Sequence, residues 1–116
     1  MTSISANAFS GCSKLQTVTI GKNVTFIGDK AFYKCKKLSK IVIPAKVKKI
    51  EKEVFSGCSK LKSITIKTSK LTTKSVGAKA FKGIYAKAVI KVPKKKKAAY
   101  IRMLRTKGIG KKVIIR

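Results

Sequence analysis

The residues with the most reactive side chains in this sequence are three cysteines, Cys12, Cys35 and Cys58, spaced 23 residues apart. If equivalent residues stack on neighbouring strands of a sheet, these thiols would lie about 5 Å apart, which permits a disulfide between adjacent copies. Each cysteine, however, lies between a phenylalanine and a leucine, and free cysteine is among the most buried residue types. An odd number also leaves one thiol unpaired. We therefore expect no disulfide, and a buried ladder of reduced thiols.

The sequence has few residues that could carry out acid–base catalysis or bind a metal ion. The sequence has no histidine, and its acidic residues are only Asp29, Glu51 and Glu53. The two glutamates flank Lys52 beside further lysines, so ion pairing in solvent explains them better than general acid–base catalysis does. A metal site would need more ligands than these, and the segment Gly108–Lys111 is too short for a phosphate-binding loop. We predict no enzymatic activity, no catalytic or metal-binding residue and no cofactor.

The cysteines belong to a longer repeat, and the strands and turns of that repeat position the other residues. Phe9, Phe32 and Phe55 are 23 residues apart, and a fourth copy at Phe81 follows after 26. A fixed period of this length indicates a solenoid, in which each unit buries its apolar face against its neighbours. Apolar residues alternate with polar ones after each phenylalanine, which predicts a half-buried strand in every copy. We expect the following stretches to form a parallel sheet: 15–20, Ile41/Ile43, Ile64/Ile66 and Ile90/Val92.

Each unit also predicts a second, weaker strand and a tight turn. The second strand corresponds to 24–27 and 47–50, with Ile4 and Val76 at matching places in the outer copies. A single helical or 3₁₀ turn fits between this strand and the phenylalanine. The third linker is three residues longer than the others, and its polar stretch 68–75 is expected to form a surface loop. In the fourth unit Ile84 stands at the cysteine offset and Lys87 at the leucine offset.

The C-terminal residues predict a cap over the last repeat. Pro93 precedes a stretch with apolar residues at helical spacing, and Gly108 follows it. These signals predict a helix over about 94–107, followed by a strand over about 112–116. The sequence thus predicts one α/β domain, with about 3.5 repeats in 1–93 and the cap in 94–116.

The repeat resembles that of the BspA-like leucine-rich repeat proteins. The stretch Ile27–Pro44 has Ile-Gly, Ala-Phe, a spaced Cys, a Leu and Ile-x-Ile-Pro in that family's order, and the resemblance covers roughly residues 4 to 93. It implies a right-handed α/β leucine-rich-repeat solenoid with a parallel β-sheet. It also implies a secreted or cell-surface protein of bacterial type, for some of whose members adhesion has been proposed. Because Met1 stands inside a repeat, we expect the chain to be the C-terminal piece of a longer protein.

Charge suggests a second class of partner. The chain has 30 Lys and Arg against three acids, a formal charge of +27, which attracts polyanions. A lysine lies five residues after each of the first three repeat phenylalanines. These residues form a lysine ladder that could bind a polyanion: Lys14, Lys37 and Lys60. Its binding would weaken steeply with salt. The alternative is that these charges have no ligand, and only keep the molecule soluble and discourage association of molecules through their sheet edges.

Alternation along the strands identifies the possible binding face. The side chains that point away from the core are Thr17, Thr19, Lys40, Val42, Ser63, Thr65, Val89 and Lys91. We predict a non-enzymatic protein-interaction or adhesion module. The alternatives are a charge-driven binder of teichoic acid, glycosaminoglycan or nucleic acid, and a structural spacer and end cap. Aromatic residues for base stacking are few, and we expect Tyr33, Tyr85 and Tyr100 not to be interleaved with the lysine ladder, which argues against specific nucleic-acid recognition. No apolar run is long enough to span a bilayer, so we expect no membrane insertion.

Overall fold

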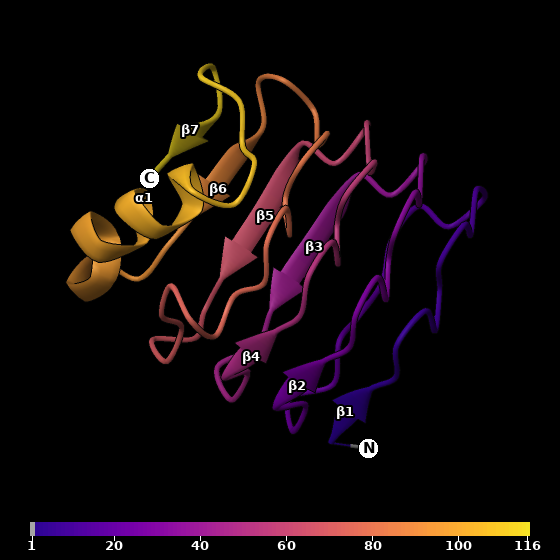
Figure 1. Cartoon of the computed structure of the whole chain (residues 1–116), viewed down its shortest axis with the longest axis horizontal. Coiled ribbons are helices and arrows are strands. Elements are labelled where there is room, and N and C mark those ends of the chain that lie inside the picture. The colour runs from indigo at the N-terminus through magenta and orange to yellow at the C-terminus, as the bar shows by residue number, and fades with distance from the viewer. Residues whose placement is uncertain (1) are drawn as a thin grey trace.

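The chain coils into a stack of repeats in the computed structural model, which describes residues 2–116 (Figure 1). Two parallel sheets run along the stack. The smaller sheet has the order β1-β2-β4, formed by Ser3–Ile4, Phe26–Ile27 and Lys49–Ile50. The larger sheet has the order β3-β5-β6-β7, formed by Lys40–Ile43, Ser63–Ile66, Val89–Lys91 and Ile114–Ile115. The fold is the leucine-rich-repeat solenoid that the sequence predicts.

Pairing in both sheets joins equivalent residues of successive repeats. Ile41 pairs with Ile64, and Ile64 with Ile90, so identical buried side chains stack through the larger sheet. Ile4, Ile27 and Ile50 do the same in the smaller sheet. Because each strand contributes only two to four residues, the fold depends on this in-register stacking and not on long strands.

The first predicted strand is wrong in its extent. Residues 15–20 form no regular strand, and only Thr17 makes an isolated parallel bridge, to Lys40. The stretch is held to its neighbour by two further contacts, since the backbone N–H and the hydroxyl of Ser39 both donate to the carbonyl of Gln16. Pairing on one side only therefore leaves the first copy less regular than the next two.

The repeat phenylalanines form a continuous aromatic stack. Ring centroids are 5.4 Å apart for Phe9 and Phe32, 5.5 Å for Phe32 and Phe55, and 5.5 Å for Phe55 and Phe81. The last three rings are fully buried, whereas Phe9 at the first copy is 37% exposed. The stack fixes the spacing between neighbouring repeats at about one strand separation.

The turns before and after each phenylalanine are sharper than the helical or 3₁₀ turn expected. Two repeat positions take a positive φ. The first is occupied by Asn7, Lys30, Glu53 and Lys79, and the second by Gly11, Lys34, Gly57 and Gly83. Hydrogen bonds then run between copies, as when the Phe32 N–H donates to the Val54 carbonyl. Other bonds close each turn on itself three residues back, as when the Tyr33 N–H donates to the Lys30 carbonyl. The turns thus alternate bonds along the stack with bonds inside the turn, and they do not extend into a helix.

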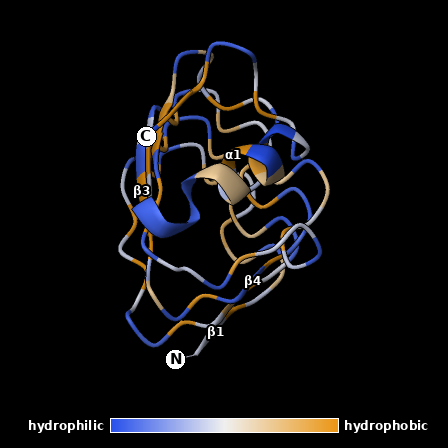
Figure 2. Ribbon diagram, turned by 90° about the vertical axis from the view of Figure 1, so that its left-hand side faces the viewer, coloured by the Kyte–Doolittle hydropathy of each residue, from blue (hydrophilic) through white to orange (hydrophobic). Residues whose placement is uncertain are grey.

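The C-terminal cap is shorter than predicted but of the predicted kind. A 3₁₀ turn, η1 (Lys94–Lys96), precedes helix α1 (Lys97–Arg105), and β7 pairs with β6. Seen from that end, α1 lies across the stack between the two sheets (Figure 2). Its buried residues are Tyr100, Met103 and Leu104. Neither helix of the described chain is long and apolar enough to cross a membrane.

The long third linker is not simply a polar surface loop. Thr68 is fully buried, and its hydroxyl donates to the Val47 carbonyl. Leu71 is also buried. In the next unit Lys87 is exposed and Ala88 is fully buried beside β6. The fourth repeat departs from the pattern of the others but keeps an apolar core. Ala88 takes the place of the leucine, one residue later and with a smaller side chain.

Candidate interaction surface

The outer face of the larger sheet consists of rows of residues that differ from copy to copy. The pairing places Lys40, Ser63, Val89 and Ile114 in one row, and Val42, Thr65 and Lys91 in the next. None of the eight residues predicted for the binding face is buried. Between these rows the buried positions are all isoleucine. The repeat therefore separates a constant interior from a variable exterior.

Sequence reasoning missed Ile114 as a member of this face. Its side chain is 46% exposed and lies beside Val89 at the C-terminal end of the sheet. A strand over 113–115 places Ile114 on the opposite face from Val113 and Ile115, but all three residues are apolar, so the sequence does not indicate which face is outside. In the structure Val113 is buried and Ile114 is not. The row that begins at Thr17 therefore changes from polar to apolar at Val89 and Ile114.

The three ladder lysines are exposed at the edge where the strands of the larger sheet begin. Two of them, Lys37 and Lys60, line a shallow depression of about 280 Å³ together with Gln16 and Ser39. A second depression, of about 260 Å³, is lined by Ser39, Lys60, Lys62 and Tyr85. The two share Ser39 and Lys60, so they are contiguous. Lys14 lies outside both.

Tyr85 was also missed as a possible binding residue. Its ring is 44% exposed, one of three large apolar or aromatic side chains that are exposed in the described residues. At the same distance from the repeat phenylalanine, the other copies have Ser13, Lys36 and Ser59. The sequence shows this difference, but only the fold shows that the ring lies beside the lysine ladder.

The cysteines are structural, and one is less buried than predicted. All three are free, and Cys35 and Cys58 are fully buried, whereas Cys12 is only half-buried at the first copy. The thiol of Cys35 donates to the Phe9 carbonyl at 3.0 Å, and that of Cys58 to the Phe32 carbonyl at 3.1 Å. Burial raises the pKa of Cys58 to about 12 and also raises that of Cys35. These thiols therefore stay protonated and tie each repeat to the preceding one.

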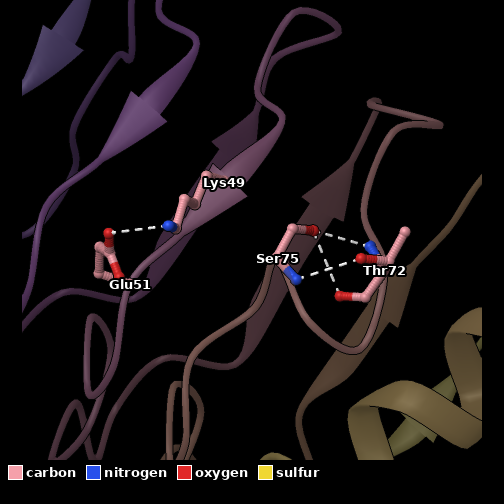
Figure 3. A network of polar contacts seen from close by, with 4 residues as sticks. All are labelled: Lys49, Glu51, Thr72 and Ser75. Carbon is pink, nitrogen blue, oxygen red and sulfur yellow. Dashed lines mark hydrogen bonds and ion pairs between the residues drawn. The ribbon is translucent and has the colours of Figure 1, made fainter.

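The acidic residues do not converge on a common site. Glu51 pairs with Lys49 at 3.6 Å (Figure 3), and Glu53 occupies one of the left-handed turn positions. One carboxylate oxygen of Asp29 is enclosed without a hydrogen-bond partner. Within residues 2–116 no group of three His, Cys, Asp or Glu side chains is placed to hold a metal ion.

A further cleft separates the long linker from the cap helix. It is lined at its base by Leu71, Tyr100 and Met103, and at its rim by basic residues of η1 and α1. Thr72 and Ser75 hold the linker in shape through reciprocal hydrogen bonds between backbone and side chain (Figure 3). The Tyr100 hydroxyl donates to the Thr68 carbonyl at 2.8 Å and accepts from the Leu71 N–H at 3.1 Å. The base of this cleft is thus part of the contact that holds the linker against the cap helix.

Comparison with known proteins supports the reading of the repeat. A family model described as "BspA type Leucine rich repeat region (6 copies)" matches residues 1–102. A leucine-rich repeat protein from Bacteroides ovatus, known from a crystal structure, is similar with a TM-score of 0.81 and 29% sequence identity. That match covers 98% of this chain and 27% of the other, so the chain spans about a quarter of its relative's length. A search of curated proteins found no significant match.

The repeat offsets, the stacked phenylalanines and the family match over 102 residues agree with one another. The resemblance drawn from the sequence is therefore confirmed. The chain belongs to the BspA-type leucine-rich repeat family.

Proposed function

We propose that the chain is a non-enzymatic interaction and adhesion module of a secreted or cell-surface protein, and that the outer face of the larger sheet contacts its partner. Leucine-rich repeat chains of this family are interaction modules and typically not enzymes, and they are typically secreted or found at the cell surface. The partner proposed here is a protein with an acidic surface, because the chain carries a formal charge of +27.

One observation carries this proposal. Along the stack, the inward residues Ile41, Ile64 and Ile90 are identical, whereas their outward neighbours Lys40, Ser63 and Val89 all differ. Residues that only hold the stack together need to repeat, whereas residues that contact a non-repeating partner need not. The outer face offers apolar, hydroxyl and cationic groups on a rigid sheet, which suits recognition with little ordering cost on binding.

The test uses the intact chain and purified extracellular-matrix glycoproteins at physiological ionic strength. Thr65→Glu places a negative charge in the middle of the outer face, and Ala98→Glu makes the same charge change on an exposed position of α1. We expect binding to at least one glycoprotein, weakened about tenfold or more by Thr65→Glu, since a misplaced charge in an interface costs at least about 1.4 kcal/mol. Ala98→Glu should have little effect. Equal effects of the two changes, or no binding to any matrix protein, would count against the proposal.

A second candidate function is binding of an anionic polymer along the lysine ladder. It is favoured by the exposure of Lys14, Lys37 and Lys60 and by the near absence of compensating acids, since Lys49–Glu51 is the only ion pair within residues 2–116. Such binding would release counterions and so fall steeply with salt. Titration with heparin from low to physiological salt tests it. An affinity that does not change with salt, or no binding even at low salt, would exclude this function.

A further inference from the structure

The two depressions beside the lysine ladder form one groove with a distinct chemical character at each end. We call it the ladder groove, and its lining residues are Gln16, Lys37, Ser39, Lys60, Lys62 and Tyr85. One end has a neutral amide beside Lys37, the middle has Ser39 beside Lys60, and the other end has the Tyr85 ring beside Lys62. No acidic residue lines it. The groove crosses four successive repeats, from Gln16 in the first to Tyr85 in the fourth, and therefore runs along the stack.

The Tyr85 end of the groove is held in a defined position by backbone hydrogen bonds. The Tyr85 N–H donates to the Leu61 carbonyl at 3.2 Å, and the Tyr85 carbonyl accepts from the Ala88 N–H at 3.0 Å. The first bond ties the tyrosine to the preceding repeat, next to Lys60 and Lys62. The ring is exposed although burial of such a ring would normally be favourable, and an aromatic face held at the surface suits a ligand with an apolar face of its own.

We propose that the ladder groove is a binding subsite for an anionic polysaccharide. The sulfate or carboxylate groups of the polysaccharide contact Lys37, Lys60 and Lys62, and one of its sugar rings packs a C–H face against the Tyr85 ring. Ser39 and Gln16 face the sugar hydroxyls. This inference rests on the second proposed function and narrows its ligand to a saccharide.

The spacing of the groove favours a polysaccharide over other polyanions. Successive repeats are about 5.5 Å apart, as the phenylalanine stack shows, so equivalent lysines recur at a distance comparable to the length of one sugar residue in a chain. Proteins that bind single-stranded nucleic acid use several aromatic side chains on which successive bases stack. The ladder groove offers one ring among three lysines. A polyphosphate without sugar rings would use the lysines but would gain nothing from Tyr85.

The test measures the affinity of a sulfated oligosaccharide by calorimetry, using the whole chain and matched variants. Tyr85→Ala removes the ring and Tyr85→Phe keeps it. The double change Lys37→Gln with Lys60→Gln removes two charges from the groove, whereas Lys48→Gln with Lys74→Gln removes two exposed charges outside it. Tyr85 makes these two hydrogen bonds through its backbone, so the changes to its side chain leave both in place. Circular dichroism verifies folding of each variant.

We expect Tyr85→Ala and the groove double variant each to weaken binding about tenfold or more, as loss of a stacked ring or of two ionic contacts does elsewhere. Tyr85→Phe and the outside double variant should stay close to the parent chain. Unchanged affinity in Tyr85→Ala, or equal effects of the two lysine pairs, would overturn the proposal.

Two further polymers separate the alternatives. A single-stranded DNA of matched charge that binds as tightly, with the same loss in Tyr85→Ala, would show a nucleic-acid site and overturn the saccharide assignment. A linear inorganic polyphosphate, which has no sugar ring, that binds as tightly as the oligosaccharide would show recognition of charge alone and would also overturn it. In either case the polyanion function stands. Failure of every polymer to bind at low salt would instead remove that function together with this inference.

Discussion

At the residue scale, the stack depends on backbone conformations that some of its side chains oppose. One turn position has glycine in the first, third and fourth copies and Lys34 in the second, all with positive φ. The other has no glycine at all, and Lys79 occupies it with a φ of 57°. A left-handed conformation costs a residue other than glycine roughly 1–2 kcal/mol. The repeat therefore contains strain that the hydrogen bonds between copies offset.

Replacement of this strained residue should stabilise the protein. We expect Lys79→Gly to raise the free energy of unfolding by about 0.5–1 kcal/mol, because glycine adopts positive φ without the clash at Cβ. The neighbouring Ala78 has no positive φ, so Ala78→Gly should lower stability by roughly the same amount. Urea unfolding followed by circular dichroism measures both. Destabilisation by both changes would show that the turn is not strained.

The buried thiols predict a pH dependence and an order of reactivity. Cys12 should react with an alkylating reagent well before Cys35 and Cys58, because only Cys12 is half-exposed.

The pKa of Cys58 is about 12 in the folded chain, against an ordinary value of 9.0. The unfolded chain therefore loses this proton first, and the contribution of Cys58 to stability is present below pH 9 and declines between pH 9 and 12.

Comparison with Cys58→Ala isolates this effect from the titration of the lysines. The alanine variant should be less stable than the parent chain at neutral pH, by about 1–2 kcal/mol, because it loses a buried thiol and its hydrogen bond to Phe32. The difference should shrink as the pH rises above 9. A difference that stays constant up to pH 12 would contradict the raised pKa of Cys58.

At the element scale, the long linker and the cap helix are joined through one side chain. The Tyr100 hydroxyl satisfies the Thr68 carbonyl and the Leu71 N–H, and all of these groups are buried. Burial also raises the pKa of Tyr100, so its proton stays available for donation. The linker is thus a part of the cap, although its polar composition suggests an exposed loop.

Removal of that hydroxyl should loosen both elements together. Tyr100→Phe leaves a buried donor and a buried acceptor without partners, so we expect a loss of about 2–3 kcal/mol in stability. The Leu71 amide should also exchange its hydrogen faster with solvent. Tyr85→Phe is the matched control, because the Tyr85 ring is largely exposed and its change should cost well under 1 kcal/mol. Equal effects of the two changes would refute the role assigned to Tyr100.

The sequence predicts most of the stack but little of its surface. Residues whose offsets recur, such as Phe32, Cys35 and Ile41, are assigned correctly to the core because a repeat can bury only what its neighbours also bury. Contacts between parts that do not repeat could not be foreseen. Tyr100 meets Thr68 across 32 residues, and Tyr85 meets the lysine ladder only because the fourth unit stacks on the third. Neither contact joins residues at equivalent positions of the repeat, so the repeat pattern does not predict it.

At the scale of the whole molecule, charge repulsion opposes the stack. A formal charge of +27 is distributed over a body with a radius of gyration of 12.4 Å. Screening should therefore stabilise the fold, since the Debye length shortens from about 30 Å at 0.01 M salt to about 3 Å at 1 M. We expect the melting temperature to rise over this range, as followed by calorimetry in sodium chloride. A melting temperature that falls with salt would mean that attractive pairs outweigh the repulsion.

The division between a constant interior and a variable exterior is also a claim about where partners bind. The ladder groove adjoins the starts of β3 and β5, because Ser39 and Lys62 immediately precede these strands. The smaller sheet and α1 are separate elements of the stack (Figure 1). The amide signals of the chain can report on all of these regions in one titration.

The most direct measurement is a nuclear magnetic resonance titration of the ¹⁵N-labelled chain with a sulfated oligosaccharide at moderate salt. The predicted result is a set of amide shift changes concentrated at Lys37, Ser39, Lys60, Lys62 and Tyr85. Smaller changes should extend onto the adjoining strands. Shift changes of similar size over the whole basic surface, or a maximum at the smaller sheet or α1, would contradict the account.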